Sequence, residues 1–500
     1  MRPLILPLAV DPNHAKLLHL LEASQGMRTS RLWRVWKKNG APRQVVRWVR
    51  YGYKLPFKSH PVGWNKPNPP PASPEEAAAR PAMWSKLIAN GTLLYAAPAN
   101  SQPKFLSPVR GEAKKEAGKL TGEFRVIQDL RALNVHLADH PVRYETCAHL
   151  PTMARSTDVA VCRDFKSFFY SFLLHPEDRH YTACRAPPQP HPATVGVDAS
   201  GHPVDINGLP TYVPSGIYHN SALPMGMKLS PFVVAKLTRW IQAWIRRHHC
   251  NCLFYVDDVL LFGPSAAVRH LTPLFISLMD RLGLILHPSK GWLDPRHRFV
   301  FLGLGVDFQL RQFFIPDYKL ASLAEKTKRT LQHARSHRNA VPVRSLASLV
   351  GMAASLQLAS PILPLFLRSL HDVITTRHRW SSPVFLSTQA LLDLRNLQTL
   401  SALYTSAPFR APRTASVIYT DASTRGYGGW GSTPAGALVE VSGLWEDSHW
   451  CGEINVLELE AVLLFLRANR SQLHGQHVHL RSDNSSVIAV VTRHSSRSAA

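Results

Sequence analysis

The feature that most constrains the fold is a pair of adjacent aspartates, Asp257 and Asp258, set between two apolar runs. The nonamer from Phe254 to Phe262 reads Phe-Tyr-Val-Asp-Asp-Val-Leu-Leu-Phe. Flanks of this kind favour two β-strands, which places the acids at the tip of a hairpin. Burying two neighbouring carboxylates is costly unless a cation neutralises them, and a divalent metal is the usual solution. A solvated Asp-Asp turn is the alternative for the pair taken alone.

The charge balance favours a polyanionic partner. The 500 residues include 58 Lys+Arg against 33 Asp+Glu, a formal net charge of +25. Over a folded enzyme such a charge attracts nucleic acid, with an ordinary basic protein as the alternative. Because 45% of residues are hydrophobic and 18% charged, the chain is globular rather than disordered. Its length allows about three domains.

Cysteines and apolar segments bear on the compartment. The six cysteines form no C-x-x-C pair, which favours a reduced, intracellular protein. With nucleic acid as the expected partner, we expect a ribonucleoprotein in the cytoplasm and/or the nucleus. His248, His249, Cys250 and Cys252 lie together but fit no closed tetrahedral zinc pattern. The apolar run from Pro3 to Val10 lacks a convincing cleavage site, and no stretch approaches the roughly 20 apolar residues of a membrane span. We therefore expect neither a signal peptide nor a membrane contact.

Pattern changes along the chain predict four regions. Residues 1–74 are basic and end in a Pro-rich linker, and residues 75–315 alternate helix-like and strand-like segments. Residues 316–410 turn helical, and residues 411–500 read as strand, hairpin, helix and strand.

Two of these regions show a regular pattern in detail. The helical region repeats apolar residues at three- and four-residue intervals: Leu346, Leu349, Val350, Ala353 and Leu356. The N-terminal region interleaves tryptophan with basic residues: Arg31, Trp33, Arg34, Trp36, Lys37, Lys38, Arg47, Trp48 and Arg50. That interleaving permits base stacking on a nucleic acid, and a packed helical cap is the alternative.

A third acid, Asp164, stands in a setting like that of the hairpin. It ends an apolar run and precedes an aromatic stretch, within Val161 to Tyr170. Together with the Asp-Asp hairpin, this segment resembles motif A of reverse transcriptases. The resemblance implies that Asp164 is the third metal ligand. It also implies that Phe169, five residues later, excludes a sugar 2′-hydroxyl and so selects deoxynucleotides.

Four further segments follow the order of the same family. They resemble the fingers motif, motif B, motif D and the primer-grip hairpin, and they span Gly122 to Asn134, Leu223 to Pro231, Leu282 to Lys290, and Phe301 to Asp307. Six motifs in order over about 190 residues are very unlike a chance pattern.

These four segments imply roles for individual residues. Arg125 would bind the incoming triphosphate through its fixed fork of donors. Lys290 would donate a proton to pyrophosphate, and Gly226 would let the backbone approach the nucleotide closely. Met225 would line the nascent base pair, although it departs from the polar or aromatic residue often found there. Two lysines are alternatives for assisting the fingers arginine: Lys115 and Lys119.

The C-terminal region carries a second ordered set of acids. Asp421 ends a predicted strand, Glu458 lies near the start of a predicted amphipathic helix, and Asp483 ends a later strand. This order resembles ribonuclease H, which implies a metal-dependent cut in the RNA strand of a hybrid. Glu460 is interpreted as a helix-surface acid. The apolar face of the helix is predicted to contain four residues: Val456, Leu459, Leu463 and Leu466.

The resemblance implies more ligands than this region holds. The family supplies a fourth acid and a late histidine beyond the third acid, and neither precedes Ala500. We therefore expect an incomplete, C-terminally truncated ribonuclease H-like domain.

Together these resemblances predict an α/β (α+β) multidomain protein: a right-hand polymerase with fingers, palm and thumb, followed by the ribonuclease H-like domain. They imply an RNA-directed DNA polymerase of a retrotransposon that uses two Mg²⁺ ions per active site, with Mn²⁺ as an alternative. Its partners would be an RNA template, a DNA primer or RNA–DNA hybrid and dNTPs. An element-encoded recombinase or capsid-like protein on other chains is a further candidate. The alternatives are a decayed or domesticated nucleic-acid-binding copy and an RNA-dependent RNA polymerase.

Two features resemble the DIRS-type group of retroelements, whose members integrate with a tyrosine recombinase. One is the basic segment from Trp48 to Phe57; the other is the pairing of Asp421-Ala422-Ser423 with Ile454 to Leu459. Gypsy-type elements and pararetroviruses are the alternatives. Asp198 to Gly201 is interpreted as a turn rather than an aspartic protease motif, because Ala199 replaces the required Ser or Thr.

Overall fold

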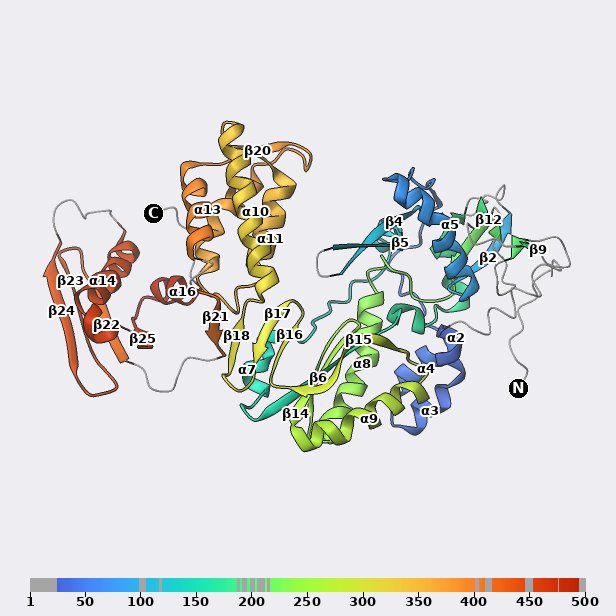
Figure 1. Cartoon of the computed structure of the whole chain (residues 1–500), viewed down its shortest axis with the longest axis horizontal. Coiled ribbons are helices and arrows are strands. Elements are labelled where there is room, and N and C mark those ends of the chain that lie inside the picture. The colour runs from blue at the N-terminus through green and yellow to red at the C-terminus, as the bar shows by residue number, and fades with distance from the viewer. Residues whose placement is uncertain are drawn as a thin grey trace. The chain divides into compact units, whose positions relative to one another are not determined.

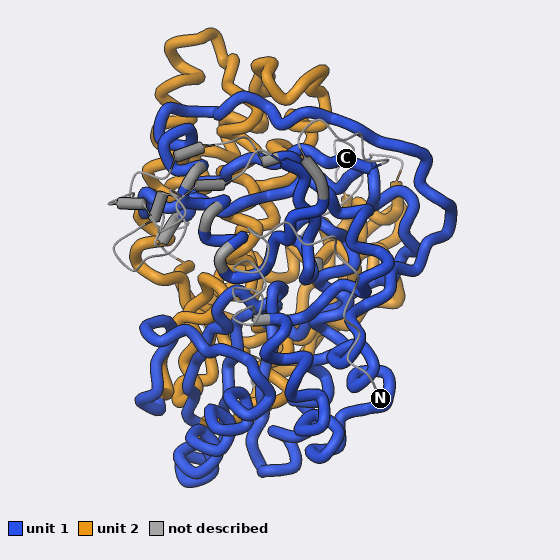
Figure 2. The backbone as a smooth tube through the Cα atoms, turned by 90° about the vertical axis from the view of Figure 1, so that its right-hand side faces the viewer, with its two compact units in different colours: residues 1–146, 159–295 blue, residues 147–158, 296–500 orange. Residues whose placement is uncertain are grey.

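In a computed structural model, the protein consists of two compact units (Figure 2). Unit 1 comprises residues 1–146 and 159–295, and unit 2 comprises residues 147–158 and 296–500. The structure describes residues 25–98, 105–116, 119–186, 189–190, 196–197, 203–204, 212–213, 216–400, 404–409, 416–445, 453–474 and 476–493. The predicted Asp198 to Gly201 turn and the Pro3 to Val10 run lie outside these residues. Both units mix helices with sheets, which confirms the predicted α/β class.

The centre of unit 1 is a four-stranded sheet in the order β13-β14-β6-β15 (Figure 1). Its strands are β6 (Asp158–Phe165), β13 (Asn251–Tyr255), β14 (Asp258–Pro264) and β15 (Leu286–Arg296). Two long helices pack on it, α8 (Ser230–Arg247) and α9 (Ser265–Arg281). β13 and β14 form the predicted hairpin, with Tyr255 opposite Asp258. The aspartates therefore lie at its turn.

The N-terminal helices belong to the same core. They are α2 (Gln25–Arg31), α3 (Trp33–Lys38) and α4 (Arg43–Tyr51). Trp36 is fully buried, and Val45 and Val49 join it in one cluster with residues of α8 and α9. The basic segment is thus packed as helices through its apolar face.

The predicted fingers lie in the same unit and contain a mixed sheet and a hairpin. The sheet runs β1-β3-β7-β12-β2, with β1 (Trp64–Asn65), β2 (Leu93–Pro98), β3 (Phe105–Leu106), β7 (Ala183–Ala186) and β12 (Gly216–Asn220). The hairpin joins β4 (Val109–Glu116) to β5 (Lys119–Gln128) and contacts α5 (Pro74–Ala89). Two small pairs occupy the Pro/Gly-rich interruption: β8 (Gln189–Pro190) with β11 (Tyr212–Val213), and β9 (Gly196–Val197) with β10 (Pro203–Val204). Short helices complete the unit: α6 (Arg131–Asn134), η2 (Phe168–Ser171) and η3 (Pro176–Thr182).

Unit 2 begins with a sheet that includes the predicted primer-grip hairpin. Its order is β16-β17-β18-β21, formed by β16 (Arg298–Phe301), β17 (Leu304–Asp307), β18 (Gln312–Phe314) and β21 (Ser406–Pro408). Residues 296–315, which the sequence grouped with the polymerase core, therefore belong to a sheet whose last pair joins β18 to a strand about 100 residues later. Two short helices belong here as well, η1 (Cys147–His149) and α7 (Leu150–Met153).

A helical bundle follows in unit 2. It contains α10 (Asp317–Ser336), α11 (Val343–Ala354), η4 (Leu363–Phe366), α12 (Arg368–Thr375) and α13 (Thr388–Leu400), with a short pair of β19 (Ala340–Pro342) and β20 (Pro383–Phe385). The five residues of the predicted apolar repeat, from Leu346 to Leu356, are all buried. Four of the five lie in α11 and confirm its helical periodicity, while Leu356 lies in the turn that follows.

The last part of unit 2 is a four-stranded sheet with helices. The order is β24-β23-β22-β25, with β22 (Ser416–Ala422), β23 (Gly426–Ser432), β24 (Leu438–Leu444) and β25 (Val478–Arg481). β22 and β25 are parallel and the other pairs antiparallel. The helices are α14 (Ile454–Ala468), α15 (Arg470–Leu473) and α16 (Ser485–Arg493).

The predicted apolar face of α14 is wrong. Its buried residues are Leu457, Glu458, Ala461, Val462 and Phe465, whereas two of the predicted four are exposed: Leu463 (44%) and Leu466 (37%). The helix is apolar on most sides, so periodicity alone could not tell which stripe faces the sheet.

Five described cysteines, at positions 147, 162, 184, 250 and 252, are buried free thiols. Within the described ranges, no helix has both the length and the apolar character that crossing a membrane requires.

Candidate active sites

The three predicted polymerase acids come together at one end of the central sheet. Asp164 is the second-last residue of β6, and β6 neighbours β14, which begins at Asp258. The N–H of Phe165 donates to the carbonyl oxygen of Asp257 at 2.9 Å, which ties the end of β6 to the hairpin turn. Val256 in that turn has φ +55°, a strained conformation for a β-branched residue. The turn therefore places two consecutive aspartates beside the end of β6, near enough to Asp164 for their charges to interact with it.

The surroundings of the three acids disfavour their ionised forms. Burial, and then the nearby charges of Asp257 and Asp164, raise the pKa of Asp258 to about 6. Burial also raises the pKa of Asp164 and of Asp257, and Asp257 adds to the shift at Asp164. Lys290 lowers all three pKa values but does not cancel these shifts. Additional positive charge would stabilise the ionised cluster.

The raised pKa of Asp258 predicts a pH-dependent stability. At pH 7 its carboxylate is ionised at a cost in the folded state. That cost disappears as pH falls from about 6 toward the ordinary value of 3.8. In metal-free buffer we expect Asp258→Asn to raise the free energy of unfolding at pH 7 by about 1 kcal/mol, after allowance for solvent screening.

Denaturant unfolding with a chelator, at pH 7 and at pH 4, measures this effect. The gain should vanish at the lower pH, where the wild-type carboxyl is protonated. An equal gain at both pH values would show that the effect does not come from ionisation.

Lys290 lies beside these acids, with its Nζ 3.9 Å from Oδ2 of Asp164. The next residue, Gly291, has φ +83°, and a Cβ there would lie 2.1 Å from the carbonyl oxygen of Cys162. β15 therefore approaches β6 more closely than any side chain allows. Arg163 spans the same two strands by donating to the carbonyl oxygens of His287 (2.9 Å) and Lys290 (3.5 Å). These two positioning contacts could not be predicted from the sequence, because the partners are more than 120 residues apart.

Arg125, Phe169 and the two fingers lysines are the next predicted polymerase residues to be placed. Arg125 is exposed on β5, and its charge lowers the pKa of Asp164 and of Asp257, so it lies near these acids. Phe169 is partly buried in η2 against the core of unit 1. The side chains of Lys115 and Lys119 lie outside what the structure describes.

The motif B glycine, Gly226, lies against the backbone of another predicted motif. Gly226 has φ +105°, and a Cβ on it would lie 2.3 Å from the carbonyl oxygen of Gln128. Its own carbonyl accepts from Nδ2 of Asn134 at 2.9 Å. The backbone that approaches it is thus that of the fingers motif. Met225, partly buried beside it, lines a small cavity together with Gln128.

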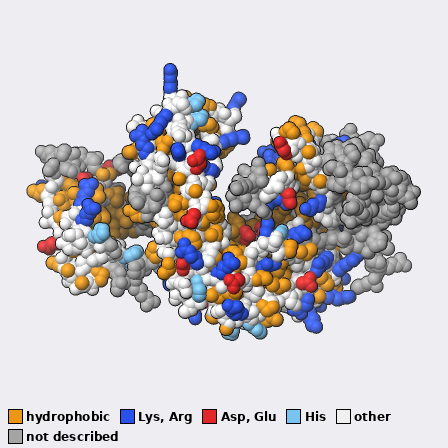
Figure 3. All heavy atoms as spheres, viewed as in Figure 1, with side chains coloured by type: hydrophobic (Ala, Val, Ile, Leu, Met, Phe, Trp, Pro, Cys, Tyr) orange, Lys and Arg blue, Asp and Glu red, His pale blue; other side chains and the backbone are white. Residues whose placement is uncertain are grey.

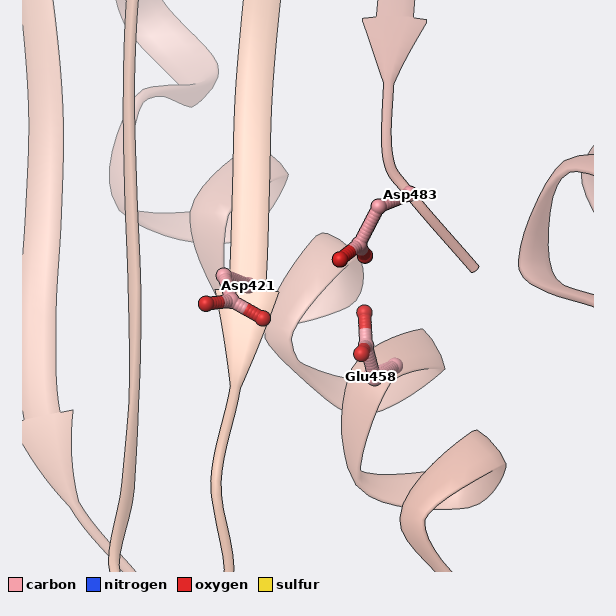
Figure 4. Close-up of side chains that lie close together, drawn as sticks. All are labelled: Asp421, Glu458 and Asp483. Carbon is pink, nitrogen blue, oxygen red and sulfur yellow. The ribbon is translucent and has the colours of Figure 1, made fainter. Parts of the chain in front are cut away.

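The three ribonuclease H-like acids meet more tightly than the polymerase acids. Asp421 on β22, Glu458 on α14 and Asp483 after β25 each place a carboxylate oxygen within 4.8 Å of the other two (Figure 4). Among the described residues this is the metal-ligand grouping that meets that distance, and the polymerase acids do not meet it. Parallel pairing of β22 with β25 brings the two aspartates to the same end of the sheet.

Glu458 is the buried member of this trio. Burial raises its pKa, and Asp421 and Asp483 raise it further. Hydrogen bonds from Asn484 and Ser482 act in the opposite direction. Its Oε2 is buried and has no hydrogen-bond partner. A cation at this point would give that oxygen the partner it lacks.

The sequence did not point to Asn484 and Ser482 as hydrogen-bond partners of Glu458. Nδ2 of Asn484 also donates to Oδ1 of Asn455 at 2.8 Å, and its Oδ1 accepts from Ser486 N–H at 2.9 Å at the start of α16. Asn484 thus links α14 to α16. Its position directly after Asp483 was the only available signal.

A cavity of about 1120 Å³ opens beside the two exposed aspartates. Tyr419 and Trp430 stack in its wall, with ring centroids 4.5 Å apart and planes at 13°. Arg481 donates to the hydroxyl of Tyr419 at 3.0 Å in the same wall. Flat rings and a guanidinium beside acids suit a nucleotide better than an apolar small molecule.

Both sites fit a hard divalent cation by their donors. Each offers three carboxylates, oxygen being the ligand that Mg²⁺ prefers, and in each a carboxylate pKa is raised by neighbouring acids. Neutralising one carboxylate, or adding a cation, would reduce the repulsion among the remaining charges in either cluster.

Comparison with known proteins assigns the central part of the chain. Residues 113–306 match the family model described as Reverse transcriptase (RNA-dependent DNA polymerase). The enzymatic polyprotein of Cestrum yellow leaf curling virus is 23% identical over 220 residues, which are 44% of this chain and 29% of that protein. Protein P of hepatitis B virus genotype C is 42% identical over 73 residues, 14% of this chain and 8% of that protein. The chain thus spans less than a third of the length of these relatives.

Solved structures support the fold over nearly the whole chain. A foamy viral protease-reverse transcriptase in complex with an RNA/DNA hybrid matches with a TM-score of 0.51 and 14% identity, covering 98% of this chain and 60% of that chain. The same protein in complex with dsDNA matches with a TM-score of 0.51, covering 98% and 92%. At this identity the likeness concerns the fold alone. The family match and the fold therefore agree that residues 113–306 are similar to a reverse transcriptase domain.

Proposed function

We propose that this protein is an RNA-directed DNA polymerase of the retroelement and viral type, which adds dNTPs to a primer 3′-hydroxyl. The observation that carries the proposal is the meeting of Asp164, Asp257 and Asp258 at one sheet end, with Lys290 beside them. Two Mg²⁺ ions held by these carboxylates would activate the 3′-hydroxyl and stabilise charge on the triphosphate.

The chain's own residues would do the remaining work around that centre. Arg125, whose side chain is exposed on β5, would bind the triphosphate through two charge-assisted hydrogen bonds. Lys290 would hold a proton for the departing pyrophosphate, since its ammonium already faces Asp164. Gly226 and Met225 would form the surface under the nascent base pair, fixed to the fingers through Gln128 and Asn134.

We propose a second activity at the C-terminal acids: hydrolysis of the RNA strand of an RNA–DNA hybrid. Asp421, Glu458 and Asp483 would hold divalent cations through the oxygens that already converge. The cavity beside them, with its stacked Tyr419 and Trp430, would hold the hybrid next to those acids.

The direct test is primer extension on an RNA template with Mg²⁺ and dNTPs, compared with the same reaction given rNTPs. Extension with dNTPs supports the proposal. Extension only with rNTPs would instead identify an RNA-dependent RNA polymerase. Template binding with no extension under either condition would identify a decayed or domesticated nucleic-acid-binding protein.

Phe169 provides a test of sugar selection. We expect Phe169→Val to raise the ratio of rNTP to dNTP incorporation by roughly tenfold to a hundredfold, because a smaller side chain leaves space for the 2′-hydroxyl. Single-nucleotide incorporation kinetics measure the ratio. Phe385→Val, which alters a 69% exposed ring in unit 2, is the control and should leave it unchanged. An unchanged ratio in Phe169→Val would place the sugar elsewhere.

We also propose which group of retroelements the protein comes from. The Trp48 to Phe57 segment and the context of Asp421 and Glu458 support a DIRS-type retroelement, in which a recombinase on another chain would be the partner. We propose an intracellular ribonucleoprotein with its own RNA as the setting, supported by the net charge of +25.

A further inference from the structure

Helices α2, α3 and α4 present basic side chains that neither proposed active site uses. Residues 25–51 contain eight Lys or Arg and no Asp or Glu. Arg28 pairs with Asp280 of α9 at 2.5 Å. Within the described part of the chain, five others are exposed and have no carboxylate at ion-pair distance: Arg34, Lys37, Lys38, Arg43 and Arg47. Figure 3 shows Lys and Arg side chains gathered over this part of unit 1.

This basic surface stands on a rigid base. The indole Nε1 of Trp36 donates to the carbonyl oxygen of Leu282 at 3.0 Å, and its ring lies 5.6 Å from that of Trp240. The hydroxyl of Thr29 donates to the carbonyl oxygen of Gly283 at 3.2 Å. Because the apolar face is locked into the core of unit 1, the opposite face is held in a fixed orientation.

Aromatic rings hold two of the guanidinium groups in place. The guanidinium of Arg50 lies 4.2 Å from the ring centroid of Trp33 and 4.7 Å from that of Tyr51. The guanidinium of Arg34 lies 5.2 Å from a ring centroid of Trp33 as well. Cation–π contacts fix these side chains without consuming their N–H donors, as a carboxylate would. Tyr51 remains 46% exposed beside them.

We infer that α2–α4 form a second nucleic-acid-binding surface, which holds the phosphodiester backbone of a single strand outside the polymerase site. Fixed guanidinium forks match phosphate oxygens, and the exposed Tyr51 ring offers a face for an unpaired base. An anionic membrane is a poorer partner, because it requires apolar side chains projecting beside the cations. In α3 and α4, Trp36, Val45 and Val49 are instead buried, and the other apolar side chains except Tyr51 are partly buried. The inference does not depend on catalysis by either set of acids.

A matched pair of triple variants tests this surface. One is Arg34→Gln/Arg43→Gln/Arg47→Gln. The control is Arg239→Gln/Arg247→Gln/Arg269→Gln, which removes three exposed arginines from α8 and α9 of the same unit. The probe is a short, unstructured, fluorescently labelled single-stranded RNA, whose affinity for the full-length protein is measured by anisotropy across a salt series.

We expect the α2–α4 variant to bind about tenfold or more weakly than the wild type, and its log–log salt slope to fall by about 2, since each lost single-strand contact removes about 0.7. The control should change both quantities much less. Thermal unfolding of both variants should match the wild type, because all six side chains are exposed.

Three outcomes would overturn the inference. Equal losses in the two variants would show only a general effect of net charge. If the wild type binds a duplex probe as tightly as the single strand, and the α2–α4 variant loses both equally, the surface is not specific for a single strand. Binding to anionic phospholipid vesicles that exceeds RNA binding, and that the variant loses, would identify a membrane surface. Primer extension is measured on the same variants, so that a change in RNA binding can be distinguished from a failure of the polymerase proposal.

Discussion

Asp257→Asn is expected to abolish primer extension while leaving template binding nearly intact. The substitution removes one anionic oxygen ligand and keeps the size of the side chain. Lewis-acid stabilisation by a bound metal contributes several kcal/mol to a transition state, so its loss should lower the rate by roughly a thousandfold or more. Binding depends on many basic groups spread over the chain and should change little.

The fold should survive this substitution. The pKa of Asp257 is raised by burial, so the folded protein disfavours its ionised form and a neutral amide removes that cost. The turn is held by a backbone hydrogen bond from the N–H of Phe165 to the carbonyl oxygen of Asp257. This bond does not involve the side chain, so it remains when asparagine replaces the aspartate. Loss of activity together with normal unfolding would therefore indicate lost metal binding rather than lost structure.

Single-turnover extension on an RNA template, with Asp294→Asn as the control, measures the effect. Asp294 is an exposed acid on β15 of the same sheet, so the control has the same chemistry outside the cluster. Activity within about tenfold of wild type in Asp257→Asn would contradict the proposed metal-binding role. Equal losses in both variants would indicate a general electrostatic effect.

Glu458→Gln is expected to reduce hybrid cleavage by roughly a thousandfold and to leave primer extension unchanged. Glu458 is the buried member of the C-terminal trio, and its Oε2 has no protein partner. Its charge is also opposed by Asp421 and Asp483, which raise its pKa. Neutralising it should thus leave stability unchanged or slightly higher, while removing an anionic oxygen from the proposed metal site.

The matched control is Glu460→Gln, two residues along the same helix. It is only partly buried and lies outside the cluster, and it should retain cleavage. The measurement is release of labelled fragments from an RNA–DNA hybrid with Mg²⁺ or Mn²⁺. If the wild type does not cleave under either condition, the nuclease proposal fails and the polymerase proposal stands. Cleavage lost in Glu460→Gln but kept in Glu458→Gln would reverse the assignment within the helix.

The sequence alone determined the local chemistry of both sites. The Asp257-Asp258 pair between β-forming runs predicted a hairpin with acids at its turn, and β13 and β14 form it. The apolar repeat from Leu346 to Leu356 predicted a buried helical stripe, which the structure confirms. Strand alternation and helical periodicity are properties of neighbouring residues, so they can be read without knowing the partners.

Contacts between distant segments were decided only by the tertiary structure. The sequence chose the wrong stripe of α14, because that helix is apolar on most sides and its sheet partner was unknown. It did not indicate that Gly226 packs against the carbonyl oxygen of Gln128 in the fingers motif, about 100 residues earlier in the chain. It left open whether the tryptophans near the N-terminus stack on bases or pack, and Trp36 is fully buried.

The catalytic acids show the same division. Their identity and order along the chain were determined by the sequence. Their convergence depends on parallel pairing of β22 with β25 and on the adjacency of β6 and β14, segments about 60 and 90 residues apart. Their raised pKa values follow from that convergence, since a carboxylate's ionisation depends on burial and on charges brought near it by folding. The sequence specified which groups carry the charge, and the fold determined what that charge costs.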